Sequence, residues 1–216
     1  LAVNMVHISI AKSKQKFAGG LFLENFTPEQ YNASSQVWSA NQDSRGIMYF
    51  GTNRCMLSFD GVTWRKHPAR NNSIIRSIAI DDNDCIFVGS YNEFGGFATD
   101  STGNLVYYSL SKLLPDSLQN FQNVWHTYHI EDYIYFVTEG RVFIYNGDTL
   151  SNVEVQLNAL FSFKIGNQLF LVDAYNGITS LKGTELRNLE NCEIFAEKRS
   201  GIINILDYSE NKILIV

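Results

Sequence analysis

Residues 47–52 read IMYFGT, an apolar run that returns along the chain in related forms. The later copies are CIFVGS at 85–90, YIYFVT at 133–138, QLFLVD at 168–173 and KILIV at 212–216. Each is apolar at consecutive positions, which is typical of a strand that is covered on both faces of its sheet. The runs therefore predict inner strands of buried sheets, repeated through the chain.

Each of the first four runs follows a segment of alternating polarity and a short polar turn. The alternating segments are VWSANQD at 37–43, IRSIAID at 75–81, VWHTYHI at 124–130 and LFSFKI at 160–165. A period of two with a turn of two or three residues indicates antiparallel β-hairpins rather than helices. An aromatic or apolar third strand clearly follows each of the first three runs, for example at 55–59 and 141–145.

The spacing of the repeat predicts the architecture. The apolar runs end at Gly51, Gly89, Val137, Val172 and Val216, at intervals of 38, 48, 35 and 44 residues. Propeller blades recur every ~40–50 residues, and successive four-stranded sheets of this period pack radially. We therefore predict an all-β fold, a β-propeller of four-stranded antiparallel blades, with a β-sandwich as the alternative.

The predicted domain is a partial propeller over residues 25–216 with about four and a half blades in an incomplete ring. Its blades cover approximately 34–70, 74–112, 122–156, 158–190 and, in part, 202–216. A ring closes only when its last blade meets its first, so we expect a fragment of a longer polypeptide or a second copy that supplies the missing strands. Residues 1–24 form a separate segment, in which 1–11 are either the remnant of a secretion signal or a first strand.

Composition excludes some functions. The net charge is −5 without any cluster of Lys and Arg, so this region is not expected to bind nucleic acid. No apolar run approaches the ~18–20 residues that span a bilayer. Cys55, Cys85 and Cys192 are widely spaced without a CxxC motif and are expected to be buried, although the sequence leaves one disulfide open.

The first two blades carry motifs that resemble a known family. Residues 25–33 read NFTPEQYNA and lead into QVW at 36–38, QDSRGIMYFG at 42–51 and LSFDGVTW at 57–64. The second blade contains VGSYNEFGGFATDSTG at 88–103. These stretches resemble the two-component-regulator propeller sensors of Bacteroidetes, closely over the first hundred residues and only in period and pattern beyond them.

The resemblance implies a periplasmic, ligand-sensing propeller without enzymatic activity of its own. In that family the propeller precedes a triple-tyrosine Ig-like domain, a membrane span and an output module. The expected partners are therefore downstream signalling domains in the same polypeptide, which tether it to the inner membrane, and a small-molecule or oligosaccharide ligand. A sensor needs two arrangements between which a ligand selects, and contacts in a homodimer could provide the second one. No cofactor is expected.

The candidate ligand-binding residues lie where propellers usually bind, at the starts of first strands and in the loops after second strands. Their aromatic, amide and charged side chains suit a saccharide. The alternative for Trp38 and Trp125 is packing between blades. The candidates are Trp38, Arg76, Trp125 and Phe161 at the strand starts, and Asn53, Arg54, Tyr91, Asn92, Glu93, Glu139, Arg141, Asp173 and Tyr175 in the loops.

Two other functions remain as alternatives, a carbohydrate-active propeller enzyme and a protein-interaction scaffold. SFDGVTW at 58–64 nearly matches the Asp-box of sialidase-like propellers, which is itself a structural turn, and no pair of carboxylates stands out as catalytic. His126 and His129 are three apart on a predicted strand and face opposite ways, so no metal site is expected. Gly95-Gly96 is expected to form a bend between strands.

Overall fold

The structure is a computed structural model that describes residues 24–155, 157–173, 177–192, 195, 204–209 and 212–216. The predicted segment 1–24 lies almost entirely outside these residues. The described chain forms four four-stranded antiparallel sheets and one two-stranded sheet, and in each the strands follow one another in sequence order.

The first sheet consists of β1 (Val37–Gln42), β2 (Met48–Thr52), β3 (Cys55–Phe59) and β4 (Trp64–Pro68). The second consists of β5 (Ser77–Ile80), β6 (Ile86–Gly89), β7 (Phe94–Thr99) and β8 (Leu105–Ser109). The third consists of β9 (His126–Ile130), β10 (Tyr133–Val137), β11 (Arg141–Tyr145) and β12 (Leu150–Glu154).

The fourth sheet consists of β13 (Leu157–Ile165), β14 (Gln168–Asp173), β15 (Gly177–Lys182) and β16 (Glu185–Asn188). The last sheet is the hairpin of β17 (Ile205–Ser209) and β18 (Lys212–Ile215). Short helical segments connect the strands, namely α1 (Pro28–Tyr31), η1 (Arg70–Asn72), η2 (Ser111–Leu113) and η3 (Asp116–Leu118).

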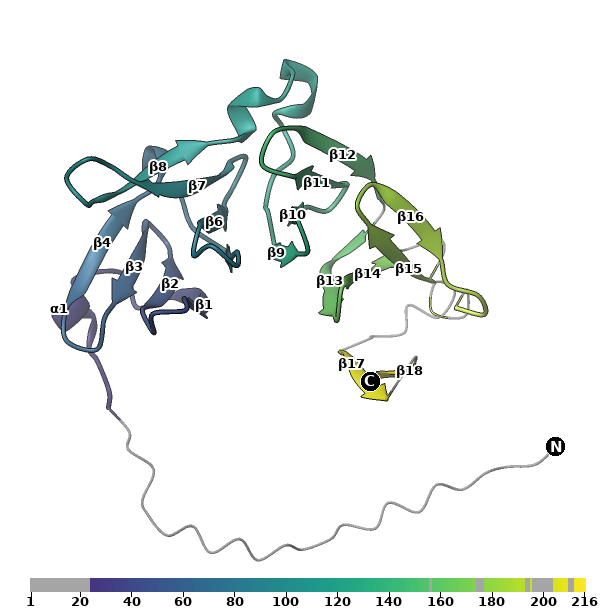
Figure 1. The fold of residues 1–216 in the computed structure, drawn as a ribbon, viewed down its shortest axis with the longest axis horizontal. Helices are drawn as coiled ribbons and strands as arrows, with labels where there is room; N and C mark the ends of the chain where they lie inside the picture. Colours follow the sequence, from purple (N-terminus) through teal and green to yellow (C-terminus); the bar gives the residue numbers. More distant parts are fainter. Residues whose placement is uncertain (1–23, 156, 174–176, 193–194, 196–203, 210–211) are drawn as a thin grey trace, which may run out of the picture.

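The sheets are arranged as the blades of a β-propeller. Figure 1 shows them side by side around a common centre, with first strands β1, β5, β9 and β13 innermost and the fourth strands outermost. The described blades form an open arc. The predicted propeller with an incomplete ring is therefore confirmed, and the sandwich alternative is wrong, because the inner sheets of the arc pack against neighbours on both faces.

Each pair of neighbouring sheets encloses its own apolar layer, which explains the consecutive apolar residues of the second strands. In β6, Ile86 and Val88 face the layer shared with the first sheet, while Phe87 faces the layer shared with the third sheet. In β10, Phe136 packs towards the second sheet and Tyr135 towards the fourth. Burying both faces of an inner strand removes its whole apolar surface from water, at about 25 cal/mol per Å².

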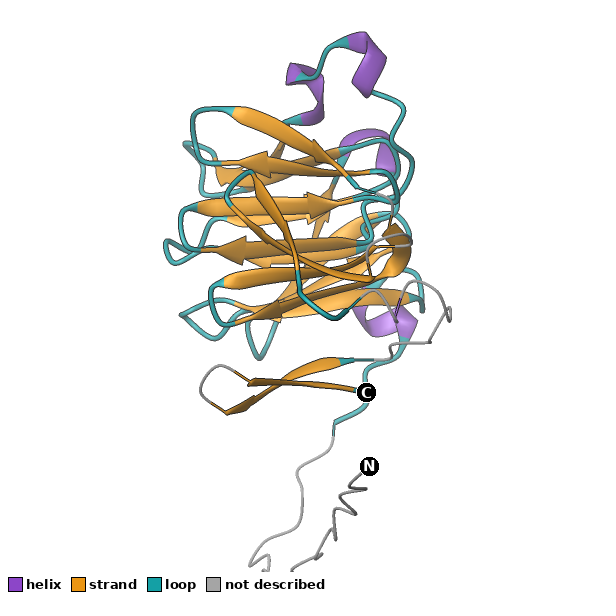
Figure 2. Ribbon diagram, turned by 90° about the vertical axis from the view of Figure 1, so that its right-hand side faces the viewer, coloured by secondary structure: helices purple, strands orange, loops and turns teal. Residues whose placement is uncertain are grey.

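The connections between strands lie on two opposite sides of the propeller, and the two sides differ in structure. Figure 2 shows short hairpin turns along the left side and the helical segments with the longer loops on the right. We call these the turn end and the loop end. Because β1, β5 and β9 all run from the loop end to the turn end, the starts of the first strands and the loops after second strands gather at the loop end.

Acidic and amide side chains organise the turn end. Asp60 Oδ1 accepts hydrogen bonds from the backbone N–H groups of Val62 and Thr63 at 3.0 and 2.7 Å. In the next blade, Asp81 Oδ1 accepts hydrogen bonds from the backbone N–H groups of Asn83 and Cys85. Such side-chain turns stabilise the chain reversal locally. The near Asp-box is thus a structural turn, as its sequence predicted.

Two expectations from the sequence are wrong. Cys55 is buried as expected and Cys192 is half-buried, but Cys85 is exposed because it lies in the turn before β6. Gly95 and Gly96 lie within β7 rather than in a bend between strands. A Cβ atom on Gly95 would stand 2.0 Å from the Tyr108 carbonyl oxygen, so the glycine permits the close approach of β8.

A buried histidine makes the fold sensitive to acid. His67 on β4 lies between the first and second sheets, where its Nε2 is 2.8 Å from Ser58 Oγ. Burial, reinforced by the nearby Arg65 charge, lowers the pKa of His67 below its usual value. The unfolded chain therefore binds more protons as the pH falls below about 6.5, and the free energy of unfolding decreases in that range.

The His67→Gln variant tests this acid sensitivity. We expect its free energy of unfolding to fall less steeply than that of the wild type as the pH is lowered from about 7 to below about 6.5. Urea denaturation at a series of pH values measures both slopes. Equal slopes for the variant and the wild type would show that His67 titrates alike in the folded and unfolded states.

Candidate functional site

Three of the predicted residues form a stack at the inner edge of the loop end. The guanidinium carbon of Arg76 lies 4.5 Å from the ring centroid of Trp38 and 4.6 Å from that of Trp125. The residues come from the starts of the first strands in three successive sheets. An arginine between two indole faces gains about 0.5–2 kcal/mol per contact, more as it is desolvated. We call these three residues the Trp–Arg–Trp stack.

The strand register brings the three residues together. Ser39, Ser77 and His126, which immediately follow the stacked residues, pair with the second-strand positions Gly51, Gly89 and Val137. The glycines also let the next blade approach. A Cβ on Gly51 would lie 2.6 Å from the Ile75 carbonyl oxygen, and one on Gly89 would lie 2.4 Å from Val124 Cγ1. Larger residues would push the strand that carries Arg76 or Trp125 away.

Loop residues fix the polar atoms of the stack. Trp38 Nε1 donates to Asn53 Oδ1 at 2.7 Å, and Trp125 Nε1 donates to Glu139 Oε1 at 3.2 Å. Arg76 Nε donates to Asn123 Oδ1 at 2.7 Å. Each partner lies in a loop of the loop end, so both rings and the guanidinium are held in defined orientations. The site is therefore largely formed before a ligand arrives.

The stack remains accessible to solvent. Trp38 is 41% exposed, which is unusual for a tryptophan whose indole N–H is already bonded. Arg76 is half-buried, and burial lowers the pKa of its guanidinium relative to a fully hydrated arginine. The group stays charged, because arginine keeps its proton in proteins. The stack thus offers an aromatic surface beside a partly desolvated cation.

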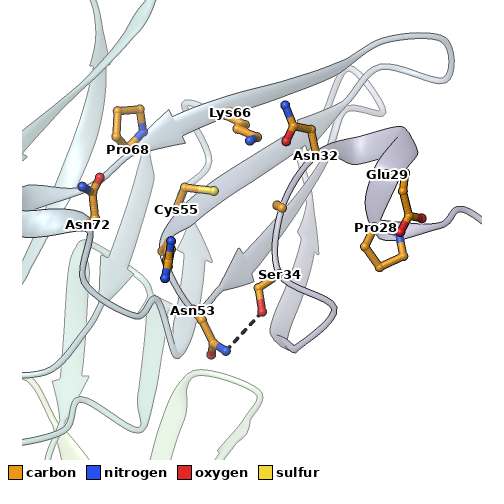
Figure 3. Close-up of a pocket in the computed structure, with 11 residues that line it drawn as sticks. Pro28, Glu29, Asn32, Ser34, Asn53, Cys55, Lys66, Pro68 and Asn72 are labelled. Carbon is orange, nitrogen blue, oxygen red and sulfur yellow. Dashed lines mark hydrogen bonds between the residues drawn. The ribbon is translucent and has the colours of Figure 1, made fainter.

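Two hollows share residues with the partners of the stack. One, of about 350 Å³, includes Glu139, and the other, of about 910 Å³, includes Asn53 and Arg54. The second lies between α1 and the first sheet, and Figure 3 shows Asn53 pointing to Ser34, to which its Nδ2 donates at 3.1 Å. The smaller hollow is lined by Ser117, Leu118, Asn120, Phe121, Gln122, Thr138, Glu139, Gly140 and Arg141.

Other predicted loop residues take positions around this site. Tyr91 is 51% exposed, and its backbone forms a bridge with Asn123, the partner of Arg76. Arg141 borders the smaller hollow, but its guanidinium is held by Asn152 and Glu154 on β12. Asn92 is occupied in structure, since its Oδ1 accepts from the Gln122 N–H and ties the two loops together. The role of these residues in ligand binding stays a prediction.

Glu93 is a correction to the predicted site, because its carboxylate is buried and fully engaged. Its Oε1 accepts hydrogen bonds from Tyr107 Oη at 2.9 Å, Ser109 Oγ at 2.6 Å and Ser111 Oγ at 2.8 Å. Its Oε2 accepts from Arg70 Nη1 at 3.0 Å. With a 5% exposed side chain it joins β8, η1 and η2 rather than facing a ligand.

Phe161 is also displaced from its predicted place. Thr127 pairs with Phe136 and Ser162 pairs with Leu171, so the position equivalent to Trp125 in the fourth sheet is Leu160. Phe161 instead packs against the apolar layer between the fourth sheet and the β17–β18 hairpin. Of the remaining candidates, Asp173 ends β14 and pairs with Gly177, and Tyr175 lies outside the described residues.

The structure adds residues that the sequence did not indicate. Asn123 and Ser34 hold Arg76 and Asn53, respectively, and both precede a first strand by a few residues. Nothing in their local sequence distinguishes them from ordinary loop residues. In the described ranges, no group of three or more His, Cys, Asp or Glu side chains is placed to bind a metal ion. The described helices are all too short to cross a bilayer.

The comparisons with known proteins support the fold. No protein-family model and no curated protein sequence matches the chain. Similar solved structures include extracellular domains of two B. thetaiotaomicron proteins. BT3049 is described as a hybrid two component system, and BT4673 is described in one structure as a hybrid two component system and in another as a one component system. BT4673 is 18% identical with a TM-score of 0.56 over 83% of this chain and 25% of its own. BT3049 is 13% identical with a TM-score of 0.59 over 89% and 29%, respectively.

A further similar structure is the WD40 β-propeller domain of Doa1, 11% identical with a TM-score of 0.55 over 83% of this chain and 61% of that domain. At such identities the likeness shows the fold alone, a β-propeller. The chain spans between a quarter and a third of the length of the two extracellular domains.

Proposed function

We propose that this chain is the ligand-binding part of an extracytoplasmic sensor in a two-component-type signalling protein, and that its ligand binds at the Trp–Arg–Trp stack. The stack carries the proposal, because it combines an exposed indole, a cation and fixed amide and carboxylate groups at the loop end. The blade motifs and the similarity to extracellular two-component domains support the sensor role.

An oligosaccharide fits this surface best. Sugar rings present C–H faces that pack on aromatic rings, and their hydroxyl groups bond to amides, carboxylates and guanidinium groups. The exposed Trp38 supplies the first kind of contact, and Glu139, Asn123 and Tyr91 border it with polar atoms. Downstream signalling domains in the same polypeptide, anchored in the inner membrane, would then receive the signal.

The location of the stack suggests how binding could be transmitted. Its three residues come from three successive blades, so a ligand that contacts the whole stack holds these blades in one relative arrangement. A ligand shifts an equilibrium only by its difference in affinity for two arrangements. A ligand that contacts several blades can therefore favour one relative arrangement of these blades, whereas a ligand that contacts a single blade cannot.

The proposal includes the absence of catalysis by this region. Glycoside hydrolysis needs two carboxyl groups about 5–9.5 Å apart on either side of the bond. Asp43 and Asp60 are engaged in turns at the turn end, and Glu93 is buried among four donors. Glu139 accepts a hydrogen bond from the Trp125 indole N–H of the stack. This distribution supports binding without turnover.

The Trp38→Ala variant tests the proposed site. We expect it to weaken binding of the oligosaccharide that the wild-type chain selects from a broad panel by about tenfold or more, because a central aromatic contact is typically worth over 1 kcal/mol. Isothermal titration calorimetry measures the affinity, and Val62→Ala, at a highly exposed position of the turn end, is the control. Equal losses in both variants, or none in Trp38→Ala, would place the ligand elsewhere, and product release in the same mixtures would indicate an enzyme.

A further inference from the structure

We infer that the ligand of the Trp–Arg–Trp stack is an acidic oligosaccharide, whose carboxylate or sulfate group binds the outward nitrogens of Arg76. This inference rests on the proposed function and adds the chemical class of the ligand. It follows from the pairing of the arginines, from the geometry of Arg76 and from the distribution of charge between the two ends of the molecule.

Arginines elsewhere in the described chain are matched with carboxylates. Salt bridges join Arg45 to Asp43, Arg65 to Asp60, Arg70 to Glu93, Arg141 to Glu154 and Arg187 to Glu185. Among the described arginines, only Arg54 and Arg76 take part in no salt bridge with a carboxylate. Arg54 follows Asn53, the partner of Trp38, so both unmatched arginines belong to the loop-end site.

Arg76 is held in a form suited to bind an anion. Its guanidinium carbon lies over both the Trp38 and the Trp125 ring, and Nε donates to Asn123, while none of the hydrogen bonds among the described residues uses Nη1 or Nη2. A planar guanidinium edge matches two oxygens of a carboxylate or sulfate. Stacking and the Asn123 bond fix the fork in advance, so little side-chain entropy is lost when an anion binds.

Many carboxylates of the chain lie away from the stack. The chain is acidic, but many of its carboxylates lie in the hairpin turns at the opposite end, among them Asp60, Asp81, Asp84, Asp100, Glu131 and Asp132. Glu139 is the acidic neighbour of the stack, and its Oε1 accepts the Trp125 N–H, which directs that oxygen to the indole. Arg76 is therefore a cation without a carboxylate partner in a salt bridge, and Glu139, which is bonded to Trp125, is the acidic group that an anionic ligand would meet beside it.

The test compares matched ligands on the wild-type 216-residue chain. The probes are acidic trisaccharides of several ring types, carrying carboxylate or sulfate groups, each paired with its carboxyl-reduced or desulfated form. Calorimetric titration is expected to give about 10–100-fold tighter binding for the acidic member of the selected pair, the range of a charge-assisted hydrogen bond, and a weaker preference at high salt. The carboxylate and sulfate pairs separate the two kinds of anion.

Two variants locate the effect at Arg76. Arg76→Gln is expected to remove the preference for the acidic member, while Arg187→Gln, which deletes an equal charge on β16, keeps it. Equal binding of both members of a pair by the wild type, or an unchanged preference in Arg76→Gln, would overturn the inference and leave the proposed function standing. A lack of binding by every member of every pair would overturn both.

Discussion

Replacing Phe94 by alanine is expected to lower the free energy of unfolding by about 3–5 kcal/mol, the usual cost of removing a buried aromatic ring. Phe94 begins β7 and is fully buried. Its ring stacks on Phe136 at 4.4 Å between centroids and also contacts Phe143 at 5.1 Å and Phe121 at 5.3 Å. Alanine would leave a cavity between the second and third blades that rigid neighbouring strands cannot fill.

Urea denaturation monitored by circular dichroism measures this loss. Phe94→Leu keeps much of the volume and should lose clearly less, and Val106→Ala, on an exposed position of β8, should change the free energy of unfolding by no more than about 0.5 kcal/mol. A loss below about 1 kcal/mol for Phe94→Ala would mean that the layer between the two blades is not packed as described.

Removing the Glu93 carboxylate is expected to have the second-largest effect. Glu93→Ala should destabilise the fold by about 2–4 kcal/mol, because the Tyr107, Ser109 and Ser111 hydroxyls would lose their acceptor in a buried site. The Arg70 partner is 44% exposed, so the ion pair adds less than a fully buried one would. The buried carboxylate also helps to raise the pKa of Tyr107, for which burial itself is the larger cause.

Glu93→Gln separates hydrogen bonding from charge. Its amide oxygen can still accept from the serine hydroxyls, whereas its amide nitrogen would face the Arg70 guanidinium. We therefore expect its free energy of unfolding to lie between that of the wild type and that of Glu93→Ala. Chemical denaturation at neutral pH gives the three free energies. Ligand affinity should stay unchanged in the glutamine variant, and a selective loss of affinity without a loss of stability would restore Glu93 to the binding site.

Much of the fold follows from short-range patterns. Consecutive apolar residues such as Ile86-Phe87-Val88 are needed wherever a strand faces a neighbouring blade on each side, and the structure places them so. The turn chemistry of Asp60 is equally local. The residues of the Trp–Arg–Trp stack could be anticipated because each immediately precedes the first-strand residue that pairs near the end of the second strand in the first three blades.

The errors have different causes. The prediction for Phe161 is one residue out, because Ile165 pairs with Gln168 as Ile130 pairs with Tyr133, and counting back from the turn puts Leu160 at the position of Trp125. Glu93 lies in a loop after a second strand, as a ligand-binding residue would, but its partners on β8 and η2 are 14 to 18 residues away in sequence. Cys85 adjoins an apolar run, which is why burial is expected, but it lies in the turn between β5 and β6 and is exposed.

The central claim is that ligand binds at the Trp–Arg–Trp stack, and the chain's three tryptophans allow a direct test. In a ¹⁵N–¹H spectrum each indole N–H gives one signal, assigned with single Trp→Phe variants. Trp64 is the internal control, since it packs between Phe59 and Phe26 on the first sheet, away from the stack. Titration with the selected oligosaccharide should shift the Trp38 and Trp125 signals and leave Trp64 in place. Saturable binding that moves Trp64 alone, or none of the three, would contradict the account.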